Sequence, residues 1–283
     1  MTYQFIRAYE LLIISDNEIF NINKNRLSFD ITKTETGSDP NNAVLKIYNL
    51  SRETSRKFEG KNISVILKCG YSLVSQQAPT DIIFKGDVID YSSYKQGEDF
   101  ITRVECGDTA KQSKETQVNT SFSQNSKTKK QTLKFLIDLM NLPIDKESID
   151  LMPESKKNIS SNLVLSGRVI DSIDSLVKSE GLSWTIQNNK FILYDSKKKQ
   201  DESKSVYLLN TDTGLITLKR KIDFNIDFTA LIIPTIEPTK LIRVQSELND
   251  IDNFYTINRV DFDGDSYEGQ WTMTCEAKLN GAK

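Results

Sequence analysis

The chain has 283 residues and is long enough for about two domains, since one domain commonly takes ~100–200 residues. Hydrophobic residues make up 37% and charged residues 27%, which indicates a globular protein with buried cores and excludes a disordered chain. The 37 basic and 39 acidic side chains leave a net charge of −2, so composition favours neither nucleic acid nor an anionic membrane as partner.

The first hundred residues predict short strands separated by turns. Apolar and polar residues alternate in them, which is the two-residue period of a half-buried strand. Between two of these strands, Ser51 is expected to cap a short helix over residues 52–58, and Gly60 to end it in the left-handed conformation. Strands at this spacing are typical of an antiparallel sandwich or barrel. The predicted strands are residues 27–31, 43–48, 63–69, 82–91 and 100–106.

The composition changes after about residue 111. Residues 112–130 are almost wholly polar and predict an exposed loop, which ends in the basic cluster at residues 127–130. A nucleic-acid contact is one interpretation of this cluster. A solvated loop is favoured, because no aromatic residues alternate with the lysines as a stacking platform would need.

Two helices and a hairpin are predicted next, and together they would form a small α+β unit. The first helix ends at Pro143, and the second begins near residue 168 with Ser166 as its candidate cap and Gly181 as its candidate stop. Asn188-Asn189 tolerates positive φ and predicts a two-residue hairpin turn. The apolar helix faces are Leu133, Leu136, Ile137 and Met140, then Val169, Ile170, Ile173, Leu176 and Val177, and the hairpin strands are residues 182–187 and 190–194.

The last part of the chain returns to strands. Residues 196–205 are polar and are interpreted as a linker with a solvated lysine run, and the acidic residues 263–269 predict a hairpin loop. The strand patterns cover residues 228–233, 241–246, 254–262 and 270–277. We therefore expect a mainly β protein, α+β overall. Two antiparallel β-barrel or sandwich domains, residues 1–114 and 205–283, would flank a helix-bearing middle unit at residues 115–204.

The residue types that most enzymes and metal sites need are absent or isolated. The chain has no histidine, which removes the usual general base and the commonest transition-metal ligand. Cys69, Cys106 and Cys275 lie far apart and predict buried thiols rather than a disulfide framework or a zinc site. No phosphate-binding glycine loop and no Gly-x-Ser-x-Gly elbow occurs. We expect no enzyme activity, and no catalytic, cofactor-binding or metal-binding residue.

Two other features have a functional interpretation that is weaker than the structural one. Residues 261–265 with Glu268 resemble a calcium loop in composition, but the glycine comes too early and no acid closes the loop at the right distance. A turn at Asp263-Gly264 is favoured there. Trp184 and Trp271 could stack on a sugar or a base, but they lie within strand patterns, where core packing is expected.

Three stretches, spread in order over most of the chain, together resemble one known family. They are residues 42–51 with 65–71 and 83–87; the second predicted helix with residues 181–186 and the hairpin; and residues 208–216, 231–234, 262–265 and 271–277. Their content and order resemble the baseplate hub (tail hub) proteins of contractile-tailed bacteriophages. The family often continues with a glycine-proline turn after the position of Ile216, whereas this chain has Thr217-Leu218-Lys219-Arg220, so the contacts of that loop are not carried over.

The resemblance implies a structural virion protein that forms a homotrimer. Each subunit would supply two tail-tube-like β domains, so that three copies present a pseudo-sixfold ring to the hexameric tube and the opposite face receives the trimeric spike. The implied partners are the tail-tube protein or a tube-initiator ring and the central spike protein, with the tape-measure and baseplate wedge proteins as further candidates. DNA would only pass through the channel, and no membrane partner is implied.

The resemblance also implies a location in the virion tail baseplate. The longest apolar run near the start is residues 11–14, too short for a signal-peptide core or a membrane span, so we expect synthesis in the cytoplasm of the bacterial host.

Three alternatives stay open on the sequence. One is a minor tail-tube or distal tail protein, which would share the sheet-rich pattern. Another is a cell-wall hydrolase that uses paired carboxylates, because this chemistry needs no histidine and the chain has 39 acidic residues. The third is a free-standing β module that binds carbohydrate or nucleic acid.

Overall fold

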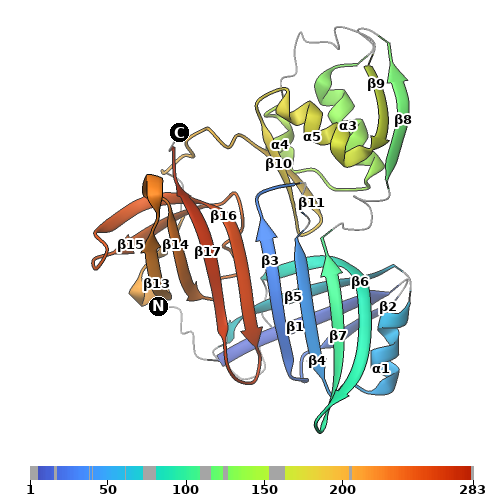
Figure 1. The fold of residues 1–283 in the computed structure, drawn as a ribbon, viewed down its shortest axis with the longest axis vertical. Helices are drawn as coiled ribbons and strands as arrows, with labels where there is room; N and C mark the ends of the chain where they lie inside the picture. Colours follow the sequence, from blue (N-terminus) through green and yellow to red (C-terminus); the bar gives the residue numbers. More distant parts are fainter. Residues whose placement is uncertain are drawn as a thin grey trace.

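The computed structural model describes residues 6–15, 18–37, 39, 41–60, 62–72, 81–108, 116–123, 127–152, 163–203 and 206–281. They form a mostly β molecule with one large sheet of 13 strands and a smaller helix-bearing unit at one end of it (Figure 1). The expected fold class, mainly β with an α+β middle unit, is confirmed. None of the helices in these ranges is long and apolar enough to cross a membrane.

Seven strands from the first part of the chain form one half of the large sheet, in the order β3-β4-β7-β6-β5-β1-β2. Side chains alternate between buried and less buried along β3 and β5, which matches the period read from the sequence. The five predicted strands are confirmed, and β1 and β2 are additional. The bounds are β1 Ile6–Ser15, β2 Glu18–Ile22, β3 Leu27–Thr34, β4 Asn42–Tyr48, β5 Ile63–Ser72, β6 Ile82–Gln96 and β7 Asp99–Gly107.

The predicted short helix is present as α1 (Arg52–Arg56), followed by the 3₁₀ turn η1 (Lys57–Glu59). Ser51 caps it as expected, because its hydroxyl oxygen accepts a hydrogen bond from the Thr54 amide at 3.1 Å. Gly60 ends this segment as expected, but the expected left-handed conformation is wrong: its φ is −70°, since the 3₁₀ turn leads the chain out in an extended conformation.

Six strands from the last part of the chain form the other half of the sheet. The order β13-β14-β17-β16 is antiparallel, while β15 pairs with β16, and β12 lies parallel to β15. The four predicted strands are confirmed. The bounds are β12 Tyr207–Leu209, β13 Leu215–Arg220, β14 Ile226–Leu231, β15 Leu241–Ser246, β16 Ile251–Asp265 and β17 Trp271–Leu279, with short 3₁₀ turns η2 Thr211–Thr213 and η3 Ile222–Phe224.

The two halves are joined by direct pairing between β3 and β16, from Arg259 opposite Thr34 to Asp265 opposite Ser28 (Figure 1). One hydrophobic core runs across this junction and includes Phe29 and Trp271, whose rings meet edge to face with centroids 5.3 Å apart. The strands of the first part and of the last part therefore form one continuous sheet.

The middle unit has its own hydrophobic core, built on two helices and two small hairpins. The predicted helices and the turn at Asn188 and Asn189, with φ of 53° and 61°, are confirmed, as is Gly181 with φ of 73°. The bounds are β8 Gln117–Phe122, α3 Lys129–Leu139, α4 Lys146–Ile149, β9 Leu163–Arg168, α5 Val169–Lys178, β10 Ser183–Gln187 and β11 Lys190–Tyr194.

Two predictions for the middle unit are wrong. Residues 112–130 are not one loop, because β8 pairs with β9 and because Thr128 caps α3, which then contains Lys129 and Lys130. The part of that loop at residues 109–115 and 124–126 lies outside the described residues. Ser166 is not a helix cap; it lies in β9 opposite Asn119, and α5 begins at Val169 without a side-chain cap.

Candidate functional site

The two halves of the large sheet repeat one arrangement of strands. Each half has a 15-residue strand, β6 or β16, whose first part pairs with another strand, β5 or β15. Each long strand then shifts register by one residue against the next strand, β7 or β17. The first pair after the shift is Asp90 with Glu105 in the first unit and Arg259 with Glu276 in the second, so these two pairs are equivalent. The strands β4 and β14, and then β3 and β13, continue the series. The chain thus contains the same sheet unit twice.

Two of the open strand edges among the described residues stand out when the two units are compared. In the second unit, residues 259–265 of β16 pair with β3 of the first unit. The matching residues 90–96 of β6 pair with β7 on one side, and no described strand lies on the other. At the far end, β13 pairs only with β14 among the described strands. An open edge of this length presents unpaired backbone groups that can bind another strand.

Large apolar side chains are exposed beside both open edges. Ile89 lies at the register shift of β6 and is 57% exposed. In the loop after β13, Ile222 is 85% and Phe224 72% exposed, and Asp223 and Phe224 both have φ of 59°. This left-handed conformation is strained for non-glycine residues. A strained loop that presents apolar side chains to solvent is typical of a protein contact surface.

The middle unit is fixed to the large sheet by its β10–β11 hairpin, which lies against the end of β3. The carbonyl oxygen of Thr34 accepts hydrogen bonds from the Thr185 hydroxyl at 3.1 Å and from the Gln187 amide at 2.7 Å. The Gly37 amide donates to the carbonyl oxygen of Trp184 at 3.0 Å, and a Cβ at Gly37 would overlap the indole ring. The loop between β3 and β4 is therefore shaped to receive the hairpin.

A buried lysine connects three parts of the chain at this joint. Lys33 in β3 is 0% exposed, and its Nζ lies 3.1 Å from Oδ1 of Asn188 in the hairpin turn and 3.3 Å from Oε1 of Glu237 in the last part. The Asn188 amide also donates to Glu237 at 2.7 Å. A buried ammonium group needs partners for its charge and its donors. Residues from all three parts must therefore be in place for Lys33 to be buried.

Asp108 is a second buried charge at the joint. Its Oδ1 accepts a hydrogen bond from the Asn189 amide at 2.7 Å, and its Oδ2 lies 3.4 Å from Nδ2 of Asn41. Burial raises the pKa of Asp108 from 3.8 to about 6, against the lowering effect of the Asn189 amide and of Lys33.

This raised pKa gives a pH prediction. A raised folded-state pKa adds stability below the ordinary pKa, and this stability is lost as pH rises through the folded-state value. From about pH 4 to about pH 7 the carboxyl should cost the folded state roughly 2–3 kcal/mol. Asp108→Asn should therefore gain roughly 2–3 kcal/mol relative to the parent over this range, measured by urea unfolding at both pH values. A difference that does not change with pH would contradict the assignment.

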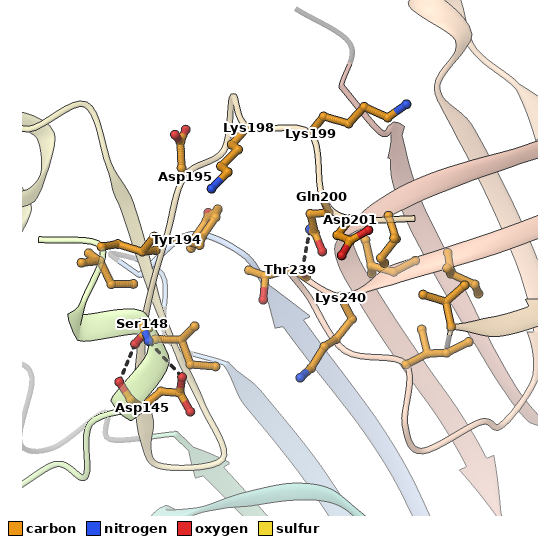
Figure 2. A pocket seen from close by; sticks show the side chains of 18 of the residues that line it. Asp145, Ser148, Tyr194, Asp195, Lys198, Lys199, Gln200, Asp201, Thr239 and Lys240 are labelled. Atoms are coloured by element: carbon orange, nitrogen blue, oxygen red, sulfur yellow. Dashed lines mark hydrogen bonds between the residues drawn. The ribbon is translucent and has the colours of Figure 1, made fainter. Parts of the chain in front are cut away.

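A cavity of about 810 Å³ lies between the middle unit, the linker and the last part of the chain (Figure 2). Lys198 and Lys240 line it together with acidic Asp145, and the pKa of Asp145 is lowered by its hydrogen bond from Lys190. On the linker side, Gln200 donates to the carbonyl oxygen of Thr239 at 3.0 Å. Charges of both signs therefore line the cavity.

The other residues singled out from sequence have structural partners. Cys69, Cys106 and Cys275 are buried free thiols, and burial raises the pKa of each. Trp184 stacks on Phe191, and Trp271 packs in the main core. The lysines at residues 127–130 bind within the unit: Lys127 lies over two phenylalanine rings, Lys129 pairs with Glu180, and Lys130 pairs with Asp150.

The predicted turn at Asp263-Gly264 is wrong, because both residues pair with β17 inside strand β16, and the chain turns only after Asp265. The acidic residue at the end of this strand orders the loop that follows. Asp265 pairs with Arg26 at 2.9 Å and accepts hydrogen bonds from the amides of Tyr267 and Glu268. Among the described residues, no three Cys, Asp or Glu side chains lie close enough to hold a metal ion.

Sequence patterns did not single out Lys33, Asp108 or the pair Ile222 and Phe224. Lys33 could have been found, because it continues the buried face of β3 in the two-residue period. The repeat of the sheet unit is visible only in the way the strands pair, and no repeated sequence motif indicates it.

Comparison with known proteins gives a family and a fold. The family model described as "Baseplate hub gp41" matches residues 39–277. No curated protein sequence matches significantly. Several solved structures share the fold, and three of them have sequence identities of 8% to 11% to this chain.

The first is the 43 kDa tail protein of prophage MuSo2 from Shewanella oneidensis, with a TM-score of 0.65, 8% identity and coverage of 97% of this chain and 99% of that chain. A tail protein from Neisseria meningitidis MC58 has a TM-score of 0.65 and 10% identity, with 97% and 98% covered. The E. coli c3393 protein, described as a type VI secretion component similar in structure to the T4 tail proteins gp27 and gp5, has a TM-score of 0.61 and 11% identity, with 90% and 74% covered. The family match extends over most of the chain, and the chain belongs to the baseplate hub gp41 family of phage tail proteins.

Proposed function

We propose that this protein is the trimeric hub of the baseplate, which adapts the sixfold tail tube to the threefold spike and lines the tail channel. The observation that carries the proposal is the repeat of one sheet unit within the chain. Three copies of a chain with two equivalent units supply six units around one axis. A closed ring of this kind can match a hexamer on one face and a trimer on the other.

The proposed hub also has a set of proposed partners. The tail-tube protein or a tube-initiator ring would bind one end of the ring and the central spike protein the other, with the tape-measure and wedge proteins as further candidates. The division at residues 1–114, 115–204 and 205–283, and synthesis in the host cytoplasm, belong to the same proposal. The similarity in fold to a protein described as resembling gp27 and gp5 supports it.

One polar face of the sheet suits the lining of a channel. Asp30, Asp261 and Asp263 lie together on it at the β3–β16 junction, beside threonine side chains. Asp30 stands directly opposite Asp263, and partial burial together with the nearby Asp30 raises the pKa of Asp263. Arg259 lies beside them and pairs with Asp261, so among the described residues Asp30 and Asp263 carry the unpaired negative charge of this hollow. In the proposed ring this face points to the channel, where these two carboxylates repel DNA phosphates.

The copy number tests this function against the tail-tube alternative. Quantitative mass spectrometry of purified particles should give three copies of this chain per tail. Six copies would favour a tube-like or distal tail protein. Turnover of cell-wall material by the purified chain, abolished by substitution of one acidic residue, would instead support a carboxylate-dependent hydrolase.

A further inference from the structure

We propose that copies of this chain join edge to edge, with residues 90–96 of β6 in one copy pairing antiparallel with β13 (Leu215–Arg220) of the next. The proposal rests on the trimeric hub and specifies its interface. It follows from the junction that the chain already makes within itself, where residues 259–265 of β16, the counterpart of residues 90–96, pair with β3, the counterpart of β13.

The pairing of the repeated strands gives the register. Asp90 corresponds to Arg259, so Tyr94 corresponds to Asp263. In the first unit, Asp30 pairs with Val44, which pairs with Glu105. In the second unit, Lys219 pairs with Asp227, which pairs with Glu276. Since Glu105 and Glu276 are equivalent, Lys219 corresponds to Asp30. Because Asp263 lies opposite Asp30, Tyr94 of one copy should lie opposite Lys219 of the next.

The same register sets the neighbouring pairs and the sheet face. Ser92 falls opposite Lys221, and Gln96 opposite Thr217. Tyr94 and Lys219 are exposed, as are Asp30 and Asp263 at the internal junction, so the side-chain alternation continues without a slip. The two aspartates that face each other at the internal junction are replaced by a tyrosine and a lysine, which removes a like-charge contact.

The exposed apolar residues meet at the same place. Ile89 corresponds to Asn258, whose carbonyl oxygen accepts a hydrogen bond from the Glu35 amide at the start of the β3–β4 loop, 2.8 Å away. The corresponding loop after β13 carries Ile222 and Phe224. In the next copy these two side chains would therefore approach Ile89, and all three would be removed from water.

The first unit holds the β10–β11 hairpin at the equivalent loop, whereas the second unit has no such cover among the described residues.

The edges β6 and β13 are different surfaces, so the contact is head to tail and can close a ring. Another open edge, that of β2, carries Ile19 at 68% exposure. The junction within the chain is formed by β16 and β3, and neither strand is the counterpart of β2. This favours β6 over β2 as the edge that binds the next copy.

Cysteine cross-linking in assembled particles tests the register. Opposite residues of an antiparallel pair have Cα atoms ~4.5–5.5 Å apart, within the range of a disulfide. Tyr94→Cys/Lys219→Cys and Ser92→Cys/Lys221→Cys should therefore give a covalent trimer as the main species after oxidation or a short bismaleimide. Tyr94→Cys/Leu218→Cys, which places the thiols on opposite faces, is the matched control and should stay mainly monomeric on a denaturing gel. The native thiols are buried and should not compete.

Failure of both same-face pairs to cross-link in particles that contain three copies would overturn this interface and leave the hub function standing. Six copies per tail would overturn the function itself. An independent test uses purified full-length protein with tube and spike proteins: Phe224→Asp should abolish incorporation, while Ile19→Asp on the β2 edge should not. The opposite result would show that β2 provides the interface.

Discussion

Gly264→Val is expected to lower the free energy of unfolding of the large sheet by about 3 kcal/mol, near the upper end for overpacking a core. Gly264 is buried in β16, opposite Phe29 of β3 on one side and Trp271 of β17 on the other. A Cβ at this position would overlap the ring of Phe29. The ring cannot move away easily, because it packs edge to face on Trp271. Urea unfolding followed by tryptophan fluorescence gives the measurement.

Gly60→Ala is the matched control for this prediction. Gly60 has φ of −70°, and the nearest atom to a Cβ there would be the flexible end of Ile63 at 3.3 Å, with the other neighbours at ordinary contact distances. We expect a change of less than about 1 kcal/mol. A Gly264→Val protein as stable as the control would show that β3 and β16 do not pack as closely as described. The β3–β16 junction could then no longer serve as the template for the interface between copies.

Lys33→Met should destabilise the joint between the three parts by about 3 kcal/mol. It would remove the ammonium group and leave Glu237 and Asn188 with no cation between them. The effect should be strongest on the middle unit, since Lys33 reaches the β10–β11 hairpin through Asn188. Trp184 in this hairpin reports on it directly when Trp271 is replaced by phenylalanine, and its unfolding midpoint in urea gives the measurement.

Two comparisons separate the buried charge from general effects. Lys33→Met/Glu237→Gln should recover about half of the lost stability or more, because it leaves no unpaired charge. Lys278→Met removes an exposed partner of Glu35, paired at 2.9 Å, and should cost no more than about 1 kcal/mol. Equal losses for Lys33→Met and Lys278→Met would contradict the role given to Lys33.

Local patterns predicted most strands and both main helices of this chain. The alternation in β3 and β4 and the apolar spacing in α3 reflect burial on one face, which depends on neighbouring residues in the sequence. The strand β8 was not predicted, because it lies in a polar segment and only its pairing with β9 makes it a strand. The residue types of Gly60 and Ser166 favour a left-handed conformation and a helix cap, and the surrounding chain imposes other conformations.

Long-range pairing could not be predicted in the same way. The two-residue period states which face of β16 is buried, but gives no information on whether β3 lies beside it. The joint residues Lys33, Glu237 and Asn188 come from three distant segments, so no spacing in the sequence connects them. The candidate assembly surface depends on the correspondence of Asp90 with Arg259, which appears only in the strand registers. Family resemblance predicted the hub, and the structure identified the edges.

Imaging the baseplate of the intact particle by electron cryomicroscopy tests the central claim most directly. The account predicts a ring of three copies of this chain around the channel. Six sheet units should alternate between the first and the second unit, with β6 of each copy against β13 of the next. A ring of six copies, or a chain located outside the channel axis, would contradict it.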